Sequence, residues 1–409
     1  MSAGRRVVVT GGGIASSLGF DMENVFAKLR SLENCVRRMD EWDIYPQMNT
    51  RLASPVDLPP LDFPRKKIRG MGRVSRLALF AADNALKCAG LAESAELTEG
   101  RFGIAFGSSM SSVDAMLDIY GMLKTSNTKS IDATTYIRAM PHTCAANIEV
   151  FYGLTGRLIS CNTACTSGSI AIGYAYEAIR NGVQDVMIAG GADELSAVDG
   201  AIFDTLFAAS SRNDSPKKTP AAYDINRDGL VVGEGAGALI LEEYEHAVKR
   251  GAAIYAEIIG FGTNTDGTHI TQPNRTTISM ALRLALADAG ISPDEIAYVN
   301  THGTATGVGD ITETHATYDV FQRAVPVSTL KNYTGHTLGA CGAIEAWISI
   351  AMMNQGWFAP NINLANLDPE CAPLDYITGT GRNISADTIM SNNHAFGGIN
   401  TSLIFRKVK

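Results

Sequence analysis

Two stretches of the sequence, within residues 75–109 and 279–304, share the same order of predicted elements, and this repetition limits the fold more than any other feature. Each stretch contains an apolar-periodic helix, a short loop, an apolar strand and a loop of small polar residues. Chains that alternate helices and strands in this way form sheets covered by helices. The sequence therefore predicts an α/β fold of two similar halves, residues 1–250 and 251–409, the second opening on a strand at 252–260.

A second correspondence pairs the block 160–169 with the block 335–345. In each half, small and polar residues run directly into a helical pattern. Polar loops at strand ends commonly carry catalytic groups. Because equivalent loops of two similar halves meet at one crevice, we expect Cys165, His302 and His336 to lie close together.

Cys165 stands in the first of these blocks, on a predicted tight turn at the N-terminus of a helix. The helix end contributes about half a positive charge and unpaired N–H groups, and such a setting can lower a cysteine pKa from about 8.5 to about 7.5 or below. We therefore expect a reactive thiolate at Cys165. A buried structural thiol is the alternative for any single cysteine.

His302 lies in Asn-Thr-His-Gly-Thr, and Lys331 and His336 lie in Lys-Asn-Tyr-Thr-Gly-His. Each taken singly is equally well explained as a surface residue. A nucleophilic cysteine with two histidines suits acyl transfer followed by stabilisation of an enolate, because neutral imidazole N–H groups can donate to a thioester oxygen. A cysteine protease would instead need one histidine with an orienting Asn or Asp.

The glycine-rich turn 392–400 precedes the closing strand, predicted at 402–405. Its free backbone N–H groups make it a candidate oxyanion donor. An ordinary turn with a packed phenylalanine is the alternative.

A basic run interrupts a chain whose formal net charge is −8. The acidic balance argues against general nucleic-acid binding. The run is either a solvated helix start or a docking patch for an acidic partner. Its cations, here called the basic patch, are Arg65, Lys66, Lys67 and Arg69.

Several other classes of protein are disfavoured. The seven cysteines are scattered without a CxxC pair, so neither a disulfide framework nor a zinc site is expected. The first residues lack a signal-peptide pattern, and no apolar run approaches the length of a membrane span, so we expect a soluble, cytoplasmic protein.

The glycines 11–13 look like a turn but lack dinucleotide-binding spacing. The calcium-like start at 224–229 lacks its glutamate, because position 235 is Gly.

Four blocks in this order resemble the elongating β-ketoacyl-acyl-carrier-protein synthases of the thiolase superfamily. They are the cysteine block 160–169, HGTxTxxGD at 302–310, KxxxGHxLGAxGxxE at 331–345 and FGGxN at 396–400. The resemblance covers essentially the whole chain. It implies a five-layered αβαβα fold, a homodimer, acyl carrier protein as partner, and no cofactor beyond the phosphopantetheine that carries the substrates.

The resemblance also implies residue roles. Cys165 would accept an acyl chain from the carrier. His302 and His336 would hold the malonyl thioester oxygen during decarboxylation, so that the enolate attacks the acyl-cysteine. Lys331 and Glu345 would set the electrostatics around His336 without touching substrate.

Further positions are assigned by the same resemblance. The backbone N–H groups of Cys165 and Phe396 would form the oxyanion hole, with the Phe396 ring gating malonyl access. Thr304 and Thr306 would bond the phosphopantetheine arm, and Met110 would shape the acyl pocket. The basic patch would dock the carrier. No catalytic metal is implied, although relatives sometimes hold a cation near Asn300, Glu345 and Asn392.

The chain departs from housekeeping synthases at His394 and Ala395, where Phe and Gly are common, and Met110 is bulkier than the glycine of some of them. These differences do not alter the residues expected to carry out the chemistry. They leave open which acyl group is the substrate. The leading prediction is fatty acid elongation, and a specialised aryl-polyene or polyketide ketosynthase is the alternative. A noncatalytic chain-length-type partner subunit, which would form a heterodimer, is disfavoured because the expected catalytic residues are all present, namely Cys165, His302, Lys331 and His336.

Overall fold

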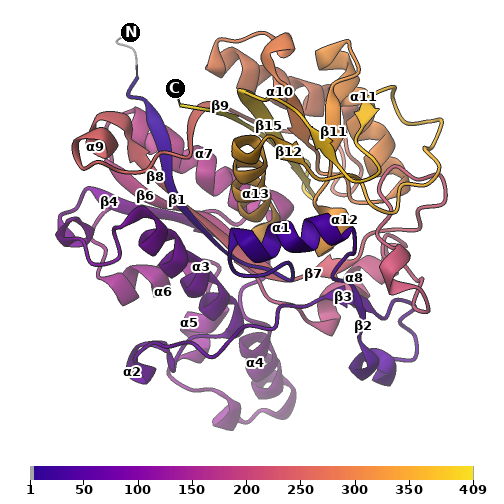
Figure 1. Cartoon of the computed structure of the whole chain (residues 1–409). Helices are drawn as coiled ribbons and strands as arrows, with labels where there is room; N and C mark the ends of the chain where they lie inside the picture. Colours follow the sequence, from indigo (N-terminus) through magenta and orange to yellow (C-terminus); the bar gives the residue numbers. More distant parts are fainter. Residues whose placement is uncertain (1–3, 409) are drawn as a thin grey trace.

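The computed structural model of the protein describes residues 4–408 (Figure 1). Its largest sheet has eleven strands in the order β13-β11-β10-β15-β16-β9-β1-β8-β6-β4-β5. The first half supplies β1 (Val7–Ala15), β8 (Gly235–Glu243), β6 (Val186–Asp193), β4 (Phe102–Gly107) and β5 (Leu158–Ser160). The second supplies β9 (Ala256–Thr265), β16 (Ile399–Arg406), β15 (Thr388–Ala395), β10 (Tyr298–Asn300), β11 (Pro326–Ser328) and β13 (Asp375–Tyr376).

The two halves repeat one topology. From β1 outward the neighbours β8 and β6 are antiparallel, and β4 and β5 then continue parallel to β6. From β9 outward, β16, β15, β10 and β11 follow the same sequence of directions. A short antiparallel pairing of β1 with β9 joins the halves. The duplication expected from the sequence is therefore visible in the strand order.

Helices form three layers around these strands. The helices α7 (Ser167–Arg180) and α13 (Cys341–Gln355) pack on each other and on strands of both halves, and α3 (Arg73–Ala89) with α6 (Thr143–Tyr152) covers the first half. On the second half, α10 (Arg275–Ala289) packs on β9 and β16 and against α11 (Gly307–Phe321). Three separate apolar clusters fill the central layer and the two outer layers. The predicted five-layered αβαβα fold is confirmed.

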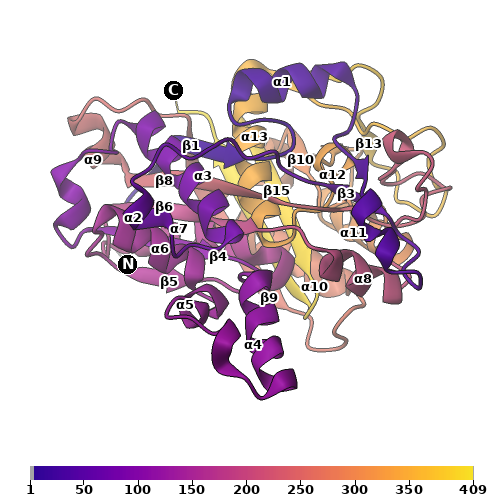
Figure 2. The same ribbon diagram turned by 90° about the horizontal axis from the view of Figure 1, so that it is seen from below.

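The remaining elements connect these layers (Figures 1 and 2). The helices are α1 (Met22–Ser31), α2 (Arg65–Ile68), α4 (Val113–Thr125), α5 (Thr135–Ala139), α8 (Ala197–Thr205), α9 (Tyr244–Lys249) and α12 (Lys331–Thr334). The short strands are β2 (Arg37–Arg38), β3 (Leu52–Ser54), β7 (Val232–Gly233), β12 (Trp357–Phe358) and β14 (Arg382–Asn383). Within residues 4–408, no helix is long and apolar enough to cross a membrane.

The glycines 11–13 do not form the predicted turn, and this prediction was wrong. They lie inside β1, which runs unbroken to Ala15. A Cβ on Gly13 would stand 2.2 Å from the Ala81 carbonyl oxygen of α3, and a Cβ on Gly12 would collide with the Trp347 ring of α13. The glycines therefore let helices pack closely on both faces of the strand.

The opening strand of the second half begins at Ala256 rather than at 252. The strand predicted within 279–304 is β10, which is preceded by a 3-10 turn at residues 293–295 that starts at a proline. The division into halves at 250/251 stays a prediction, and this position lies between α9 and β9.

Candidate active site

The central helices begin side by side because glycines leave no side chain between them. A Cβ on Gly168 of α7 would lie 2.9 Å from the Ala343 nitrogen, and a Cβ on Gly342 of α13 would lie 2.6 Å from the Ser169 nitrogen. The loops that precede both helices are therefore held against each other. This contact brings Cys165 and His336 together.

Cys165 lies in a 3-10 turn (Ala164–Thr166) directly before α7, as the sequence predicted. Ala164 has a φ of +50°, a left-handed conformation that makes the turn abrupt. The Ser167 hydroxyl accepts a hydrogen bond from the Thr163 N–H at 3.0 Å and donates to the Ala164 carbonyl at 2.7 Å. These bonds hold the turn that aims the sulfur into the site.

The predicted lowering of the Cys165 pKa was wrong for the resting protein. Burial raises the pKa of this thiol to about 11, although the Lys331 ammonium and the backbone N–H groups of Phe396 and of Cys165 itself act in the opposite direction. The loss of hydration around the sulfur raises the pKa by more than these groups lower it. Cys165 therefore rests as a thiol.

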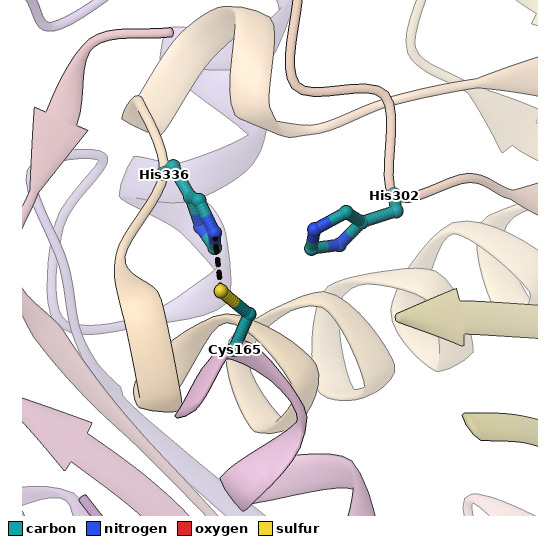
Figure 3. A group of neighbouring side chains, drawn as sticks. All are labelled: Cys165, His302 and His336. Atoms are coloured by element: carbon teal, nitrogen blue, oxygen red, sulfur yellow. Dashed lines mark hydrogen bonds between the residues drawn. The ribbon is translucent and has the colours of Figure 1, made fainter. Parts of the chain in front are cut away.

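His336 follows α12 and lies next to the sulfur, with its Nε2 3.0 Å from the Cys165 Sγ (Figure 3). Its Nδ1 accepts a hydrogen bond from the Leu338 N–H at 3.3 Å. A neutral imidazole that accepts at Nδ1 carries its proton on Nε2. The Nε2–H therefore points at the sulfur and into the space where a substrate oxygen would lie.

His302 approaches from the opposite side, on the loop after β10 (Figure 3). Its ring centroid lies 5.1 Å from that of His336, and the Cys165 sulfur and a nitrogen of each ring lie within 4.8 Å of one another. Burial and the nearby Lys331 lower the pKa of both histidines well below its ordinary value. Both rings are therefore neutral N–H donors, as the enolate chemistry requires.

A carboxylate that the sequence analysis missed fixes the His302 loop. Glu313 of α11 accepts hydrogen bonds from the N–H groups of His302 at 2.6 Å and of Gly303 at 2.8 Å. The sequence contains one indication of this role. Glu313 follows Asp310 by about one helical turn, so both side chains lie on the face of α11 that carries the His302 loop. Glu313 therefore positions His302 through its backbone N–H.

Lys331 and Glu345 form a buried ion pair with 2.5 Å between Nζ and Oε1. Burial opposes the charged ammonium, but attraction to neighbouring groups that include Glu345 outweighs it, so the pKa of Lys331 is raised. Both residues lie behind the histidines, and neither lines the active-site cavity described below. Their position agrees with the expected electrostatic role.

Oxygen atoms near Glu345 fit a monovalent cation of the kind that relatives sometimes hold. The Glu345 carboxylate accepts from Asn393 at 2.9 Å and from Asn300 at 3.4 Å. The amide oxygens of Asn300 and Asn393 are buried and have no hydrogen-bond partner among residues 4–408. The Asn392 amide oxygen is also buried and unpaired among these residues, but Asn392 adjoins Asn393 in β15, so its side chain points to the other face of the strand and away from Glu345. Hard cations prefer such amide and carboxylate oxygens.

One cavity of about 440 Å³ contains the sulfur and both rings. Thr304 and Thr306 line it, with 3.0 Å between their hydroxyl oxygens, and so does Phe396, whose ring packs on Phe203. Met110 does not line this cavity but lies in the loop after β4. Its predicted role in an acyl pocket stays a prediction.

The mouth of the cavity is bordered by exposed apolar side chains, here called the apolar rim. Their exposed fractions lie between 45% and 91%. The rim consists of Leu206, Phe207, Ile270 and Val308. Phe207 is the most exposed of them and has a φ of +54°, which is rare for a bulky residue.

The basic patch lies on and directly after α2 and is exposed. Lys67 donates to the Phe151 carbonyl at 2.9 Å. None of the four cations lines the cavity, and Figures 1 and 2 place α2 and α8 on opposite sides of the molecule. The patch is thus remote from the mouth of the cavity in its own chain.

Comparisons with known proteins agree with this site. Residues 4–247 match the family "Beta-ketoacyl synthase, N-terminal domain", and residues 255–365 match "Beta-ketoacyl synthase, C-terminal domain". The chain is 35% identical to 3-oxoacyl-[acyl-carrier-protein] synthase 1 of Haemophilus influenzae, over 98% of this chain and 99% of that protein.

Solved structures give the same result. A beta-ketoacyl synthase from Burkholderia phymatum superposes with a TM-score of 0.98 at 52% identity, covering 99% of this chain and 100% of that one. The ketosynthase AntDE, solved with the type II polyketide acyl-carrier protein AntF and bound to the hexaketide, gives a TM-score of 0.88 at 29% identity, covering 99% and 100%.

Proposed function

The chain belongs to the β-ketoacyl synthase family and is an acyltransferase, a 3-oxoacyl-acyl-carrier-protein synthase, and we propose that it elongates fatty acids with the following division of work among its residues. One observation supports the proposal above all others. The Nε2 of His336 lies 3.0 Å from the sulfur of Cys165, the only thiol that lines the cavity among residues 4–408, and the ring of His302 faces the same point.

In the first step, the sulfur of Cys165 attacks the acyl thioester on the carrier. The backbone N–H groups of Cys165 and Phe396, which already face this sulfur, stabilise the oxygen of the tetrahedral intermediate. The bond from the acyl carbon to the phosphopantetheine sulfur breaks, and the free phosphopantetheine thiol leaves with the proton that Cys165 gives up. A thiol with a raised pKa is thus used without a standing thiolate.

In the second step, His302 and His336 donate to the thioester oxygen of malonyl-carrier protein. The carbon–carbon bond to the carboxylate breaks, carbon dioxide leaves, and the electron pair forms an enolate held by the two N–H donors. The enolate carbon attacks the acyl carbonyl, the bond to the Cys165 sulfur breaks, and the sulfur regains a proton from water. A cation bound by the side-chain oxygens of Asn300 and Asn393 would add positive charge near Glu345.

The carrier protein docks over the apolar rim in this proposal. Its phosphopantetheine arm must enter through the mouth, past Thr304 and Thr306, to reach Cys165. Exposed apolar side chains at the mouth favour a carrier surface with apolar residues beside its modified serine. The basic patch would attract the acidic carrier over a longer range.

We also propose a homodimer in which β5 meets its copy. β5 is an edge strand of the main sheet. The neighbouring α4–α5 segment exposes large apolar side chains, namely Leu117, Tyr120, Leu123, Tyr136 and Ile137. Unpaired strand edges and large apolar surfaces are characteristic of subunit interfaces. Size-exclusion chromatography with light scattering tests this, and a monomer at micromolar concentration would contradict it.

Acyl specificity separates fatty acid elongation from a specialised polyketide or aryl-polyene pathway. His394 favours the second candidate, because it places a polar ring in the cavity where housekeeping relatives commonly have Phe. Intact-protein mass spectrometry after incubation with saturated, conjugated and aryl carrier-protein thioesters tests both. Preferential loading of saturated chains supports elongation, and preference for conjugated or aryl groups supports the specialised pathway. No mass gain with any donor would contradict both.

A further inference from the structure

Asp193, the last residue of β6, accepts hydrogen bonds from loops of both halves. The Ser108 hydroxyl donates to its Oδ1 at 2.8 Å, and the Ser109 hydroxyl donates to its Oδ2 at 2.7 Å. The Ser109 N–H donates to Oδ1 at 2.9 Å. From the second half, the Gly339 N–H donates to Oδ2 at 2.6 Å. The side chain therefore joins the loop after β4 to the turn before α13.

This arrangement requires an acceptor on both oxygens of Asp193. A backbone N–H group can only donate, and one such group reaches each oxygen. Asp193 is 1% exposed, and burial raises its pKa, whereas the hydrogen bonds from these donors act in the opposite direction. The donors are therefore the groups that favour a carboxylate at this depth.

The turn that Asp193 contacts, Leu338–Ala340, contains a strained residue. Leu338 has a φ of +50°, a left-handed conformation that bulky side chains rarely adopt. Such a conformation persists only where the surrounding structure enforces it. The hydrogen bond from the neighbouring Gly339 N–H to Asp193 is one contact that does so.

The same turn determines which nitrogen of His336 carries the proton. The Leu338 N–H donates to Nδ1 of His336 at 3.3 Å, which leaves the proton of the neutral ring on Nε2. Nε2 is the nitrogen that lies 3.0 Å from the Cys165 sulfur. If Leu338 relaxed to an ordinary conformation, its N–H would turn away and the preference for the Nε2–H form would be lost.

We propose that Asp193 is a positioning residue: by binding the Gly339 N–H, it holds the Leu338 turn in the conformation that keeps the proton of His336 on Nε2. The inference rests on the proposed function, because it concerns the histidine that donates to the malonyl thioester oxygen. Asp193 does not line the active-site cavity, so it acts on the reaction only through this turn.

A spectroscopic test reads the tautomer and does not depend on turnover. In protein labelled with ¹⁵N-histidine, the His336 signals are identified by their loss in His336→Gln. In the unaltered protein at neutral pH, Nε2 should show the shift of a protonated nitrogen and Nδ1 that of an unprotonated one. Asp193→Ala removes the acceptor, so the two shifts should move toward each other as both tautomers are populated. A protonated Nδ1 in the unaltered protein, or unchanged shifts in Asp193→Ala, would overturn the proposal.

Asp193→Asn covers the case in which Asp193→Ala does not fold, because it keeps the volume of the side chain. In either orientation its NH₂ group meets a backbone N–H, that of Gly339 or that of Ser109. The contacts of the carboxylate are thereby broken in part, and a smaller change of the His336 shifts in the same direction is expected. Unchanged shifts in this variant would also overturn the proposal.

Glu194→Gln is the matched control. Glu194 is the next residue, is also buried, and accepts hydrogen bonds from the N–H groups of Val74 and Val113, both at 2.7 Å. Neither of these donors lines the cavity. The His336 shifts should therefore stay unchanged in Glu194→Gln. A change as large as that in Asp193→Ala would show a general loosening of the protein and would contradict a specific role for Asp193.

A kinetic test examines the consequence for catalysis. Both Asp193 variants should slow the release of carbon dioxide from malonyl-carrier protein by about tenfold to a hundredfold, because a donor that is misplaced or wrongly protonated stabilises the enolate less well. The KM for malonyl-carrier protein should not change, since the surface around the mouth of the cavity is untouched. Glu194→Gln should keep both the rate and the KM.

The outcomes are distinguishable. Equal rates and unchanged His336 shifts in the Asp193 variants would overturn the inference while leaving the proposed function intact. Failure of every acyl donor to load on Cys165 would instead overturn the proposed function, and the ¹⁵N shifts would still decide whether Asp193 sets the tautomer of His336.

Discussion

The Nζ of Lys331 lies 2.5 Å from the Oε1 of Glu345, and neither side chain is more than 2% exposed. Glu345 sits on the first turns of α13, and Lys331 opens α12, so the pair joins the two elements on either side of His336. Buried pairs of this kind are costly to break because one charge is then left without a partner.

Lys331→Ala is therefore expected to lower the free energy of unfolding by about 3–5 kcal/mol and to impair condensation. Replacing both members, as Lys331→Met with Glu345→Gln, removes the uncompensated charge and should be less destabilising than the single change. Chemical denaturation of the three proteins measures this difference. A double variant as unstable as the single one would show that the pair acts through packing alone.

Cys165→Ala should abolish the mass gain from acyl donors and reduce condensation by at least about 10³-fold, because the variant has no atom to hold the acyl chain. Cys161→Ala is a suitable control, since Cys161 is also buried but does not line the cavity. Unchanged turnover in Cys165→Ala would exclude this residue as the nucleophile.

His302→Ala should still permit loading of Cys165 but slow the release of carbon dioxide from malonyl-carrier protein by about 10²–10³-fold, the usual effect of removing one oxyanion donor. His336→Ala should do the same and also slow loading, because its Nε2–H faces the sulfur and favours the thiolate. Separate assays of acyl mass gain and carbon dioxide release test the distinction. Full condensation in either variant would contradict the assigned roles.

The raised pKa of Cys165, about 11, predicts how the thiol reacts with iodoacetamide. The thiolate is the reactive form, so the rate should rise about tenfold per pH unit across the neutral and mildly alkaline range. Lys331→Met removes a charge that lowers this pKa, so its curve should move to higher pH. Peptide mass spectrometry follows Cys165 specifically. A midpoint near the ordinary thiol value of about 8.5 would contradict the prediction.

The apolar rim and the basic patch should have separable effects on carrier binding. Phe207→Ser should raise the KM for acyl-carrier protein several-fold at all salt concentrations, and it should not affect an acyl thioester of a small thiol. Reversing the charges of Lys66 and Arg69 should raise the KM at low salt only, because screening removes the attraction at high salt. Identical salt dependence for the two variants would show that they act on one docking surface.

The sequence alone determined the duplication, the order of the elements and the residues that meet in the cavity. The turn that carries Cys165 directly before α7 was predicted, because small and polar residues that run into a helical pattern along one chain segment suffice for this purpose. The convergence of Cys165, His302 and His336 followed from the repetition of strand-end loops, which is also a property of the linear order.

Tertiary structure decided what depends on distant segments. The glycines 11–13 form a strand rather than a turn, because α3 and α13 press on both faces of the sheet. The Cys165 thiol has a raised pKa rather than a lowered one, because burial by the surrounding layers outweighs the local helix end. The contact of His394 with Glu313 joins residues 81 positions apart. Desolvation and packing of a residue depend on all the atoms within a few ångströms of it. Those atoms come from distant parts of the chain, so no single segment of the sequence contains that information.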